Sequence, residues 1–341
     1  IRCHSVVTLS ALVVAPDLRN ELRSLGGLPI LIECLTSEDT LTAESAALSW
    51  VSLSINPKNK EEFRLKDGFA HLYGALKKSV SIPGEFRAHL VRVVCNLATL
   101  DTNRYAINSA GIIPLLTDGL TERDPIVQRY CVRALSFLAG EPKNITALYV
   151  TVDPLLACVS SADENLARDS IGALECLTVS AEVRSHVRRA NGVRPILRRF
   201  NSAACSSNLR AKCETLKVIR NLCLSTECRK DVLQPPSLAS QKVFLDALVD
   251  DTLRSSLSDL RRETFVLLQL LLKDTSVLDA LKQSHLMENI LPALDDKKEI
   301  KLLGCALACM QDLFCHQQYR SQFHTFGGIH RLLKLVDSHE N

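Results

Sequence analysis

The chain has 341 residues and a formal net charge of +3, with 46% hydrophobic and 5% aromatic residues. A charge balance this close to neutral argues against a surface tuned throughout to nucleic acid, and the scarcity of aromatic residues disfavours a β-sandwich. The longest apolar run, residues 265–272, is far shorter than the roughly 20 residues that a membrane-spanning helix needs.

The first segment, IRCHSVVTLS, already has the pattern of an amphipathic helix, so we expect the sequence to be a fragment of a longer protein. One pattern then recurs about every 42 residues: an apolar helix ends, a short helix follows, and a glycine precedes a second apolar helix. The reference position of this pattern falls at Ala11, Ser54, Asn96, Phe137, Cys176, Asn221, Leu270 and Asp312. The glycine position falls at Gly26-Gly27, Gly68, Gly111, Asn191-Gly192 and Gly327-Gly328.

Within a unit the apolar residues recur at helical spacing, as at Leu90, Val94 and Leu97. No unit is large enough to bury such a face alone, so neighbouring units must stack and share one core. We therefore predict a single stacked domain over residues 1–341, with an irregular repeat around residues 234–260, where VLQPPSLASQ interrupts the pattern.

The segments NLATLDTNRYAINSAGIIPLL and IRNLCLSTECRKDVL resemble the armadillo repeat, in which the third helix of one repeat leads into the first helix of the next. The resemblance extends over essentially the whole chain. It implies an all-α fold, a right-handed α-solenoid (superhelix) of about eight three-helix repeats. HEAT repeats are the near alternative, but they have two helices per unit and lack the glycine before the second helix.

In stacked repeats the third helices line one concave groove, and residues four apart on a helix project in the same direction. Counting back from the reference positions predicts a partner-binding groove lined by Trp50, His89, Arg92, Asn96, Arg129, Tyr130, Arg133, Phe137, Arg168, Lys217 and Asn221. The pattern resembles that of the catenins and the importin-α adaptors, where an asparagine at the reference position binds the main chain of an extended peptide. The resemblance assigns this role to Asn96 and Asn221, and a slot for a peptide side chain to Trp50.

Five of the other reference positions depart from an importin-like asparagine ladder. They hold Ser54, Phe137, Cys176, Leu270 and Asp312. This departure argues against importin-type cargo. Trp50, Asn96 and Asn221 also have structural interpretations. Trp50 could be a packed aromatic residue, and Asn96 and Asn221 could bridge adjacent helix ends.

The middle of the predicted groove is basic. Its cations are Arg92, Arg129, Arg133, Arg168 and Lys217. An acidic or phosphorylated extended segment is the partner that such a groove favours, because arginine makes charge-assisted and often bidentate contacts with carboxylate and phosphate.

A second basic cluster lies in EVRSHVRRANGVRPILRRF, on the predicted first and second helices of a repeat. Its arginines are Arg184, Arg188, Arg189, Arg194, Arg198 and Arg199. A solvated surface is the first interpretation of this patch; contact with phosphoinositide, RNA or a second protein is the alternative.

The sequence predicts no catalytic residues, no cofactor and no metal site. Phosphate-binding glycine loops and metalloprotease motifs are absent from it. The nearest metal-like string, CALACMQDLFCH, places Cys305, Cys309 and Cys315-His316 along an apolar helix, which favours core packing over zinc. The cysteines occur singly on apolar faces, which is typical of a reducing compartment, so we predict a cytoplasmic protein, with the cell cortex or nucleus as alternatives.

These patterns predict a non-catalytic adaptor that binds an extended acidic or phosphorylated segment of a partner protein. Complexes of adhesion, polarity, the cytoskeleton or trafficking are the expected setting. The alternative is a regulatory domain that senses a small phosphorylated ligand and controls a catalytic domain elsewhere in the full-length chain.

Overall fold

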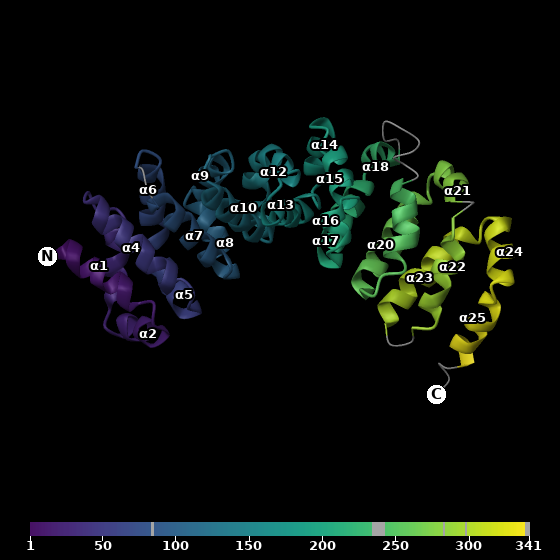
Figure 1. Ribbon diagram of the computed structural model, residues 1–341, viewed down its shortest axis with the longest axis horizontal. Helices are drawn as coiled ribbons and strands as arrows, with labels where there is room; N and C mark the ends of the chain where they lie inside the picture. The colour runs from purple at the N-terminus through teal and green to yellow at the C-terminus, as the bar shows by residue number, and fades with distance from the viewer. Residues whose placement is uncertain (83–84, 234–242, 282–283, 297–298, 338–341) are drawn as a thin grey trace. The chain divides into compact units, whose positions relative to one another are not determined.

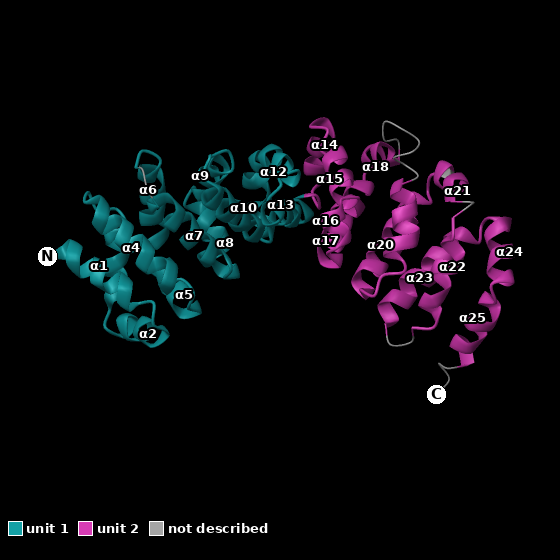
Figure 2. Cartoon of the chain, viewed as in Figure 1, with its two compact units in different colours: residues 1–177 teal, residues 178–341 magenta. Residues whose placement is uncertain are grey.

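The structure is a computed structural model that describes residues 1–82, 85–233, 243–281, 284–296 and 299–337. These residues form helices joined by short turns, and no β-strand occurs among them (Figure 1). They divide into two compact units, residues 1–177 and residues 178–341 (Figure 2). No helix in the described ranges combines the length and the apolar character needed to cross a bilayer. The single domain over residues 1–341 stays a prediction.

In unit 1, shorter helices alternate with one longer helix, which we call the third helix of its repeat. They are α1 (Arg2–Leu12), α2 (Pro16–Ser24), α3 (Gly27–Cys34), α4 (Thr40–Leu53), α5 (Pro57–Leu65), α6 (Gly68–Ser79), α7 (Phe86–Ala98), α8 (Asp101–Ser109), α9 (Ile112–Gly119), α10 (Pro125–Ala139), η1 (Pro142–Asn144), α11 (Ile145–Leu148), η2 (Tyr149–Thr151), α12 (Val152–Val159) and α13 (Glu164–Leu177). The long third helices α1, α4, α7, α10 and α13 pack each on the next. This row forms the core of the unit.

Unit 2 repeats the arrangement. Its helices are α14 (Ala181–Arg189), α15 (Val193–Phe200), α16 (Ala203–Ser206), α17 (Leu209–Cys223), α18 (Thr226–Leu233), the π-helix η3 (Ala247–Thr252), α20 (Ser258–Leu271), α21 (Thr275–Leu281), α22 (Leu286–Ile290), η4 (Leu291–Leu294), α23 (Ile300–Leu313), α24 (Gln317–Thr325) and α25 (Gly328–Asp337). The third helices α17, α20 and α23 pack in sequence order. Together the two units hold eight third helices in the described residues, which confirms the predicted all-α fold of about eight repeats.

The predicted irregular stretch at residues 234–260 is only partly visible. Residues 234–242 lie outside the described residues. Beyond them, the chain passes through the π-helix η3 before α20 begins at Ser258.

The turn between first and second helices explains the recurring glycine of the sequence. Gly26, Gly111 and Gly327 have φ values of 72°, 76° and 73°, and Asp67 and Asn191 take the same left-handed conformation in their repeats. Glycine adopts this conformation without steric cost, and aspartate and asparagine tolerate it better than other residues. The recurring glycine position of the repeat therefore reflects a backbone conformation that this turn requires.

Three asparagines on the first helices link consecutive repeats, and the sequence analysis missed them. Asn59, Asn103 and Asn144 are fully buried. Their Nδ2 groups donate to the carbonyl oxygens of Leu53, Leu97 and Leu138 at 3.1, 3.2 and 3.1 Å. The Nδ2 groups of Asn103 and Asn144 also donate to the carbonyls of Lys60 and Arg104 in the preceding repeat. Each amide thus satisfies carbonyl groups at a helix end that water does not reach.

These hydrogen bonds correct the register of the second repeat. Because Leu53 and Leu97 accept equivalent bonds from Asn59 and Asn103, Ser52 rather than Ser54 is the counterpart of Asn96. The predicted reference position was wrong there by two residues.

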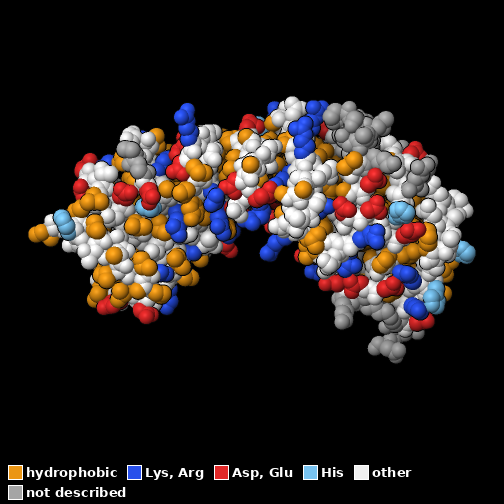
Figure 3. All heavy atoms as spheres, viewed as in Figure 1, with side chains coloured by type: hydrophobic (Ala, Val, Ile, Leu, Met, Phe, Trp, Pro, Cys, Tyr) orange, Lys and Arg blue, Asp and Glu red, His pale blue; other side chains and the backbone are white. Residues whose placement is uncertain are grey.

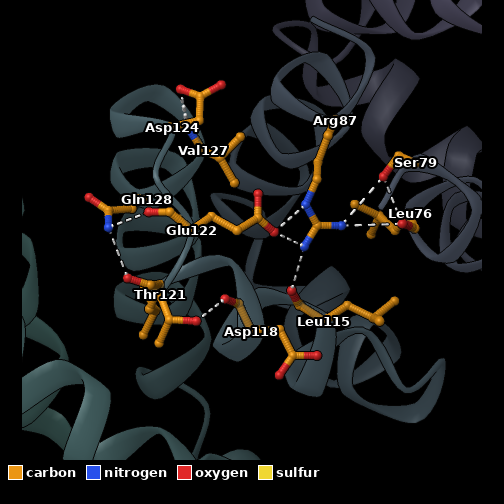
Figure 4. Close-up of polar contacts among 11 residues, drawn as sticks. Leu76, Ser79, Arg87, Leu115, Asp118, Thr121, Glu122, Asp124, Val127 and Gln128 are labelled. Carbon is orange, nitrogen blue, oxygen red and sulfur yellow. Dashed lines mark hydrogen bonds and ion pairs between the residues drawn. The ribbon is translucent and has the colours of Figure 1, made fainter. Parts of the chain in front are cut away.

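A buried ion pair joins three elements of unit 1 (Figure 4). Arg87, at the start of α7, is 6% exposed, and its guanidinium lies 2.6 Å from Oε1 of Glu122, in the loop before α10. The same guanidinium donates to the carbonyl of Leu76 on α6 at 3.3 Å and to the carbonyl of Leu115 on α9 at 3.3 Å. Ser79 Oγ accepts a further bond at 3.4 Å. One side chain therefore fixes α6 and α9 against α7.

Candidate functional site

Exposed and half-buried side chains of α7, α10 and α13 form one largely polar surface in unit 1, which we call the third-helix face. It comprises His89, Arg92, Arg129, Tyr130, Arg133, Phe137, Arg168 and Asp169. In Figure 3, Lys and Arg side chains gather on the visible surface over the α7–α10 part of unit 1, whereas the α1–α4 part shows mainly hydrophobic side chains. The structure thus brings most of the predicted unit-1 groove residues onto a common surface; their role in binding stays a prediction.

Arg92 and Tyr130 connect α7 to α10 on this face. The guanidinium carbon of Arg92 lies 5.7 Å from the centre of the Tyr130 ring, within the range of a cation–π contact. Arg92 is exposed and Tyr130 is half-buried. This contact keeps the Arg92 guanidinium near the ring, while the exposed Arg92 side chain remains accessible to an anion.

Arg129 is already paired within the protein. Its Nη2 lies 2.8 Å from Oδ2 of Asp163, which caps the start of α13. The hydrogen bond from Arg129 lowers the pKa of Asp163, and the same contact raises the pKa of Arg129. Arg129 therefore adds less net positive charge to the face than its sequence suggested.

Asp169 is a half-buried acid on the same face. Burial raises the pKa of its carboxyl group, and the nearby Arg168 and Arg133 partly oppose that rise. Arg168 lies 3.4 Å from Oδ1 of Asp169. Arg133 is exposed, and no carboxylate of the described residues lies within ion-pair distance of it or of Arg92. Arg92 and Arg133 are thus the two cations of the face best able to meet an incoming anion.

His89 and Phe137 occupy more enclosed positions on the face. Burial lowers the pKa of His89, against the opposing influence of Glu85 and Glu44. The ring therefore favours its neutral form. Phe137 is half-buried at the end of α10, so both residues contribute uncharged surface beside the arginines.

Trp50 does not belong to the exposed surface, and its prediction as a groove residue was wrong. The side chain is 0% exposed, and its ring packs edge-on against Phe63 at a centroid distance of 4.5 Å. In the corrected register, the residue of α4 that matches Arg92 is Leu48, which is 41% exposed. The exposed surface of α4 therefore carries the apolar Leu48 instead of the predicted tryptophan.

Asn96 and Asn221 bridge neighbouring helices, the structural interpretation that the sequence left open. The Nδ2 of Asn96 donates to the carbonyl of Val51 at 3.2 Å and to Oγ of Ser54 at 3.0 Å. The Nδ2 of Asn221, which is buried, donates to Oγ1 of Thr178 at 3.2 Å. Both amides thus bridge to the preceding repeat, and their role as clamps for a bound peptide stays a prediction.

Lys217 lies on α17 in unit 2 and is half-buried. Neighbouring cations of α17 are paired: Lys212 lies 3.1 Å from Oδ2 of Asp251, and Arg220 lies 2.7 Å from Oε2 of Glu263. These two cations of α17 are therefore neutralised within unit 2.

No protein-family model matches the sequence, and neither does any curated protein. Solved structures are similar in fold. One comes from a study of a phosphorylation switch that controls the interaction between cadherin and beta-catenin. It has a TM-score of 0.81 at 13% identity, over 98% of this chain and 62% of that chain. An engineered protein from a structural genomics consortium has a TM-score of 0.74 at 18% identity, over 98% of this chain and 90% of that chain.

A third structure, a designed armadillo repeat protein in complex with the peptide (KR)4, has a TM-score of 0.60 at 16% identity, over 72% of this chain and 99% of that chain. The chain has an armadillo-repeat fold. The sequence resemblance is thereby confirmed at the level of fold. The third-helix face accordingly consists of the third helices of three successive armadillo repeats.

The second basic cluster of the armadillo domain separates into different roles. Arg184 donates to the carbonyls of Thr178 and Val179 at 3.0 and 2.7 Å, which satisfies the end of the preceding helix. Arg199 is buried, with 7% exposure. The prediction of a solvated patch was therefore wrong for Arg199, whereas Arg184 is half-buried. The other four, Arg188, Arg189, Arg194 and Arg198, are exposed.

Most of the cysteines are buried, as the sequence suggested, but the core position expected for Cys315 was wrong. Among the described residues, no group of histidine, cysteine or acidic residues is arranged to hold a metal ion. Cys309 is buried on α23 and Cys315 is exposed. Burial raises the pKa of the Cys95 thiol to about 12 and also raises those of Cys131 and Cys309. These thiols are therefore protonated at neutral pH.

An aromatic disulfide reagent should consequently modify Cys315 first in the native protein. Cys95, Cys131 and Cys309 should react only when urea unfolds the chain, since reaction requires an accessible thiolate. Mass spectrometry of timed aliquots measures the order. Rapid native modification of Cys309 would contradict the packing of α23.

Proposed function

We propose that the protein is a non-catalytic armadillo scaffold whose third-helix face binds an extended acidic or phosphorylated segment of another protein. The observation that carries the proposal is the pair Arg92 and Arg133, exposed on adjacent third helices and without a carboxylate partner among the described residues. Exposed guanidinium groups pair with carboxylate and phosphate oxygens through two parallel hydrogen bonds.

The surroundings of the two arginines support an extended ligand. The Arg92 guanidinium is in cation–π contact with the Tyr130 ring, so less side-chain entropy is lost when an anion binds. On α4, next to α7, Leu41 and Leu48 are exposed. A segment that carries an apolar residue beside its acidic residues therefore fits the surface best.

The armadillo neighbours support peptide binding as the general activity. One is a designed protein in complex with the peptide (KR)4, and another comes from a study of the interaction between cadherin and beta-catenin. The arginines of the present face favour the opposite charge to a Lys-Arg peptide. The free cysteines suit a cytoplasmic adaptor, with adhesion, polarity, cytoskeletal or trafficking complexes as the proposed setting.

Fluorescence anisotropy with labelled peptides tests the proposal. The wild-type chain should bind a peptide of alternating glutamate and leucine more tightly than the same peptide with lysine in place of glutamate. The double variant Arg92→Glu/Arg133→Glu should lower the affinity at least about tenfold, which corresponds to about 1.4 kcal/mol, and should reduce its salt dependence.

The matched control is Lys58→Glu/Lys77→Glu. Both lysines are exposed in unit 1, on α5 and α6, so this variant makes the same change in net charge away from the third helices. Its affinity should change less than about twofold, because only long-range screened interactions are altered. Equal losses in the two double variants, or no preference for the acidic peptide, would refute the proposed surface.

A further inference from the structure

A pocket of about 320 Å³ opens in unit 2 where α14 turns into α15. It is lined by Arg188, Arg189, Asn191, Val193, Arg194 and Asp231. Three arginines and a single aspartate give this lining a net positive charge. In Figure 3, Lys and Arg side chains are also seen over the α14–α15 part of unit 2.

The backbone of the turn brings these arginines together. Asn191 has a φ of 55°, and the N–H of Gly192 donates to the carbonyl of Val187 at 2.8 Å. This reversal ends α14 and starts α15 within a few residues. As a result, Arg188 and Arg189 of the last turn of α14 and Arg194 of the first turn of α15 line one cavity.

The arginines differ in how they are held. Arg188 is oriented by two acids of α18, with its Nε 2.8 Å from Asp231 Oδ2 and its Nη2 3.8 Å from Glu227 Oε2. Arg189 donates from Nε to the carbonyl of Ser185 at 3.4 Å, and the side chains of Arg189 and Arg194 are exposed at the pocket. The start of α15 adds the positive end of a helix dipole and backbone N–H groups that have no partner within the helix.

We propose that this pocket binds the phosphate monoester groups of a compact small molecule, such as a phosphorylated inositol ring. Its volume is at the lower limit of small-molecule sites, which span roughly 300 to 1,000 Å³. Guanidinium groups match phosphate oxygens in geometry and charge. Single-stranded nucleic acid fits less well, because its binding relies on aromatic stacking surfaces and no aromatic residue lines the pocket.

Isothermal titration of the full chain with soluble myo-inositol trisphosphate tests the proposal, with inorganic phosphate as the minimal probe. The wild type should bind the trisphosphate saturably and more tightly than phosphate. Arg189→Gln/Arg194→Gln should lower the affinity for the trisphosphate at least about tenfold, since it removes two charge-assisted contacts to phosphate oxygens.

Two single variants separate the pocket from the general charge of this surface. Asp231→Asn should raise the affinity several-fold, because it removes the negative charge that competes with phosphate for Arg188. Arg198→Gln should leave it within about twofold, since Arg198 is exposed on the same helix α15 but does not line the pocket. Thermal melts should show that all variants are folded.

Vesicles distinguish the source of the phosphate groups. Binding to phosphatidylcholine vesicles that contain phosphatidylinositol bisphosphate, together with binding of the soluble trisphosphate, would support the site with a lipid ligand. Binding of the soluble trisphosphate alone would support it with a soluble ligand. The proposal is overturned if Arg189→Gln/Arg194→Gln binds the trisphosphate as the wild type does, or if Arg198→Gln weakens binding equally. It is also overturned if the soluble trisphosphate does not bind and only vesicles, or oligouridylate as an RNA probe, bind.

Discussion

Replacing Arg87 with methionine is expected to lower the free energy of unfolding of unit 1 by about 3 kcal/mol. The substitution leaves Glu122 without its guanidinium partner and removes the donor that serves the carbonyls of Leu76 and Leu115. Removing one member of a buried pair typically costs about 3 to 5 kcal/mol. The lower value applies because the Glu122 side chain keeps 30% exposure.

Urea unfolding followed by tryptophan fluorescence measures this loss directly. Trp50 is the single tryptophan of the chain and lies in unit 1, so its emission reports the unit that contains Arg87. The matched control is Arg129→Met, which breaks an ion pair at the surface of the same unit. Surface pairs contribute little because water screens them, so the control should unfold at nearly the wild-type urea concentration. Equal shifts in the two variants would show that the Arg87 network does not act as a buried pair.

The architecture was predictable because its determinants are local. Apolar spacing along a helix requires a buried face, and the left-handed turn before each second helix requires glycine, aspartate or asparagine, as Gly26, Asp67 and Asn191 show. Both requirements repeat with every unit. Their coincidence identified a stack of three-helix repeats before any packing was known.

The failure at Trp50 was one of register. The segment from α6 to α7 is longer than its counterparts in neighbouring repeats, since α6 runs from Gly68 to Ser79 while α9 ends after eight residues. Matching Ser54 to Asn96 ignored this extra length. The buried amides of Asn59 and Asn103 fix the true register, but their partners are carbonyl groups, which the sequence does not distinguish.

The candidate site was predictable only in its charges. Sequence spacing predicted Arg92 and Arg133 as exposed residues of the groove, and the structure has both side chains exposed. It did not reveal that Asp163 pairs with Arg129 or that Arg184 caps a helix end. The partner of Arg129 comes from the next repeat, 34 residues away, whereas Arg184 bonds carbonyls only five and six residues before it. Which of these partners an arginine takes is decided by packing.

Replacing Trp50 with alanine is expected to lower the free energy of unfolding of unit 1 by about 3 to 5 kcal/mol, the usual cost of removing a large aromatic side chain from a core. The Trp50 ring packs against Phe63, which in turn contacts Phe69 at 5.4 Å. The cavity would therefore open between α4, α5 and α6. Hydrogen exchange of these helices measures the loss without a tryptophan signal.

Trp50→Phe should cost much less than Trp50→Ala. The indole Nε1 is buried without a hydrogen-bond partner in the described residues, so the phenyl ring removes an unsatisfied donor as well as some volume. Tyr105→Ala, at a side chain with 50% exposure, is the surface control and should change stability by less than about 1 kcal/mol. Affinity for the acidic peptide separates the core role from the groove role. If Trp50 is a core residue, Trp50→Ala lowers stability while the folded fraction binds as the wild type does. If Trp50 were a groove residue, the substitution would lower the affinity and leave hydrogen exchange unchanged.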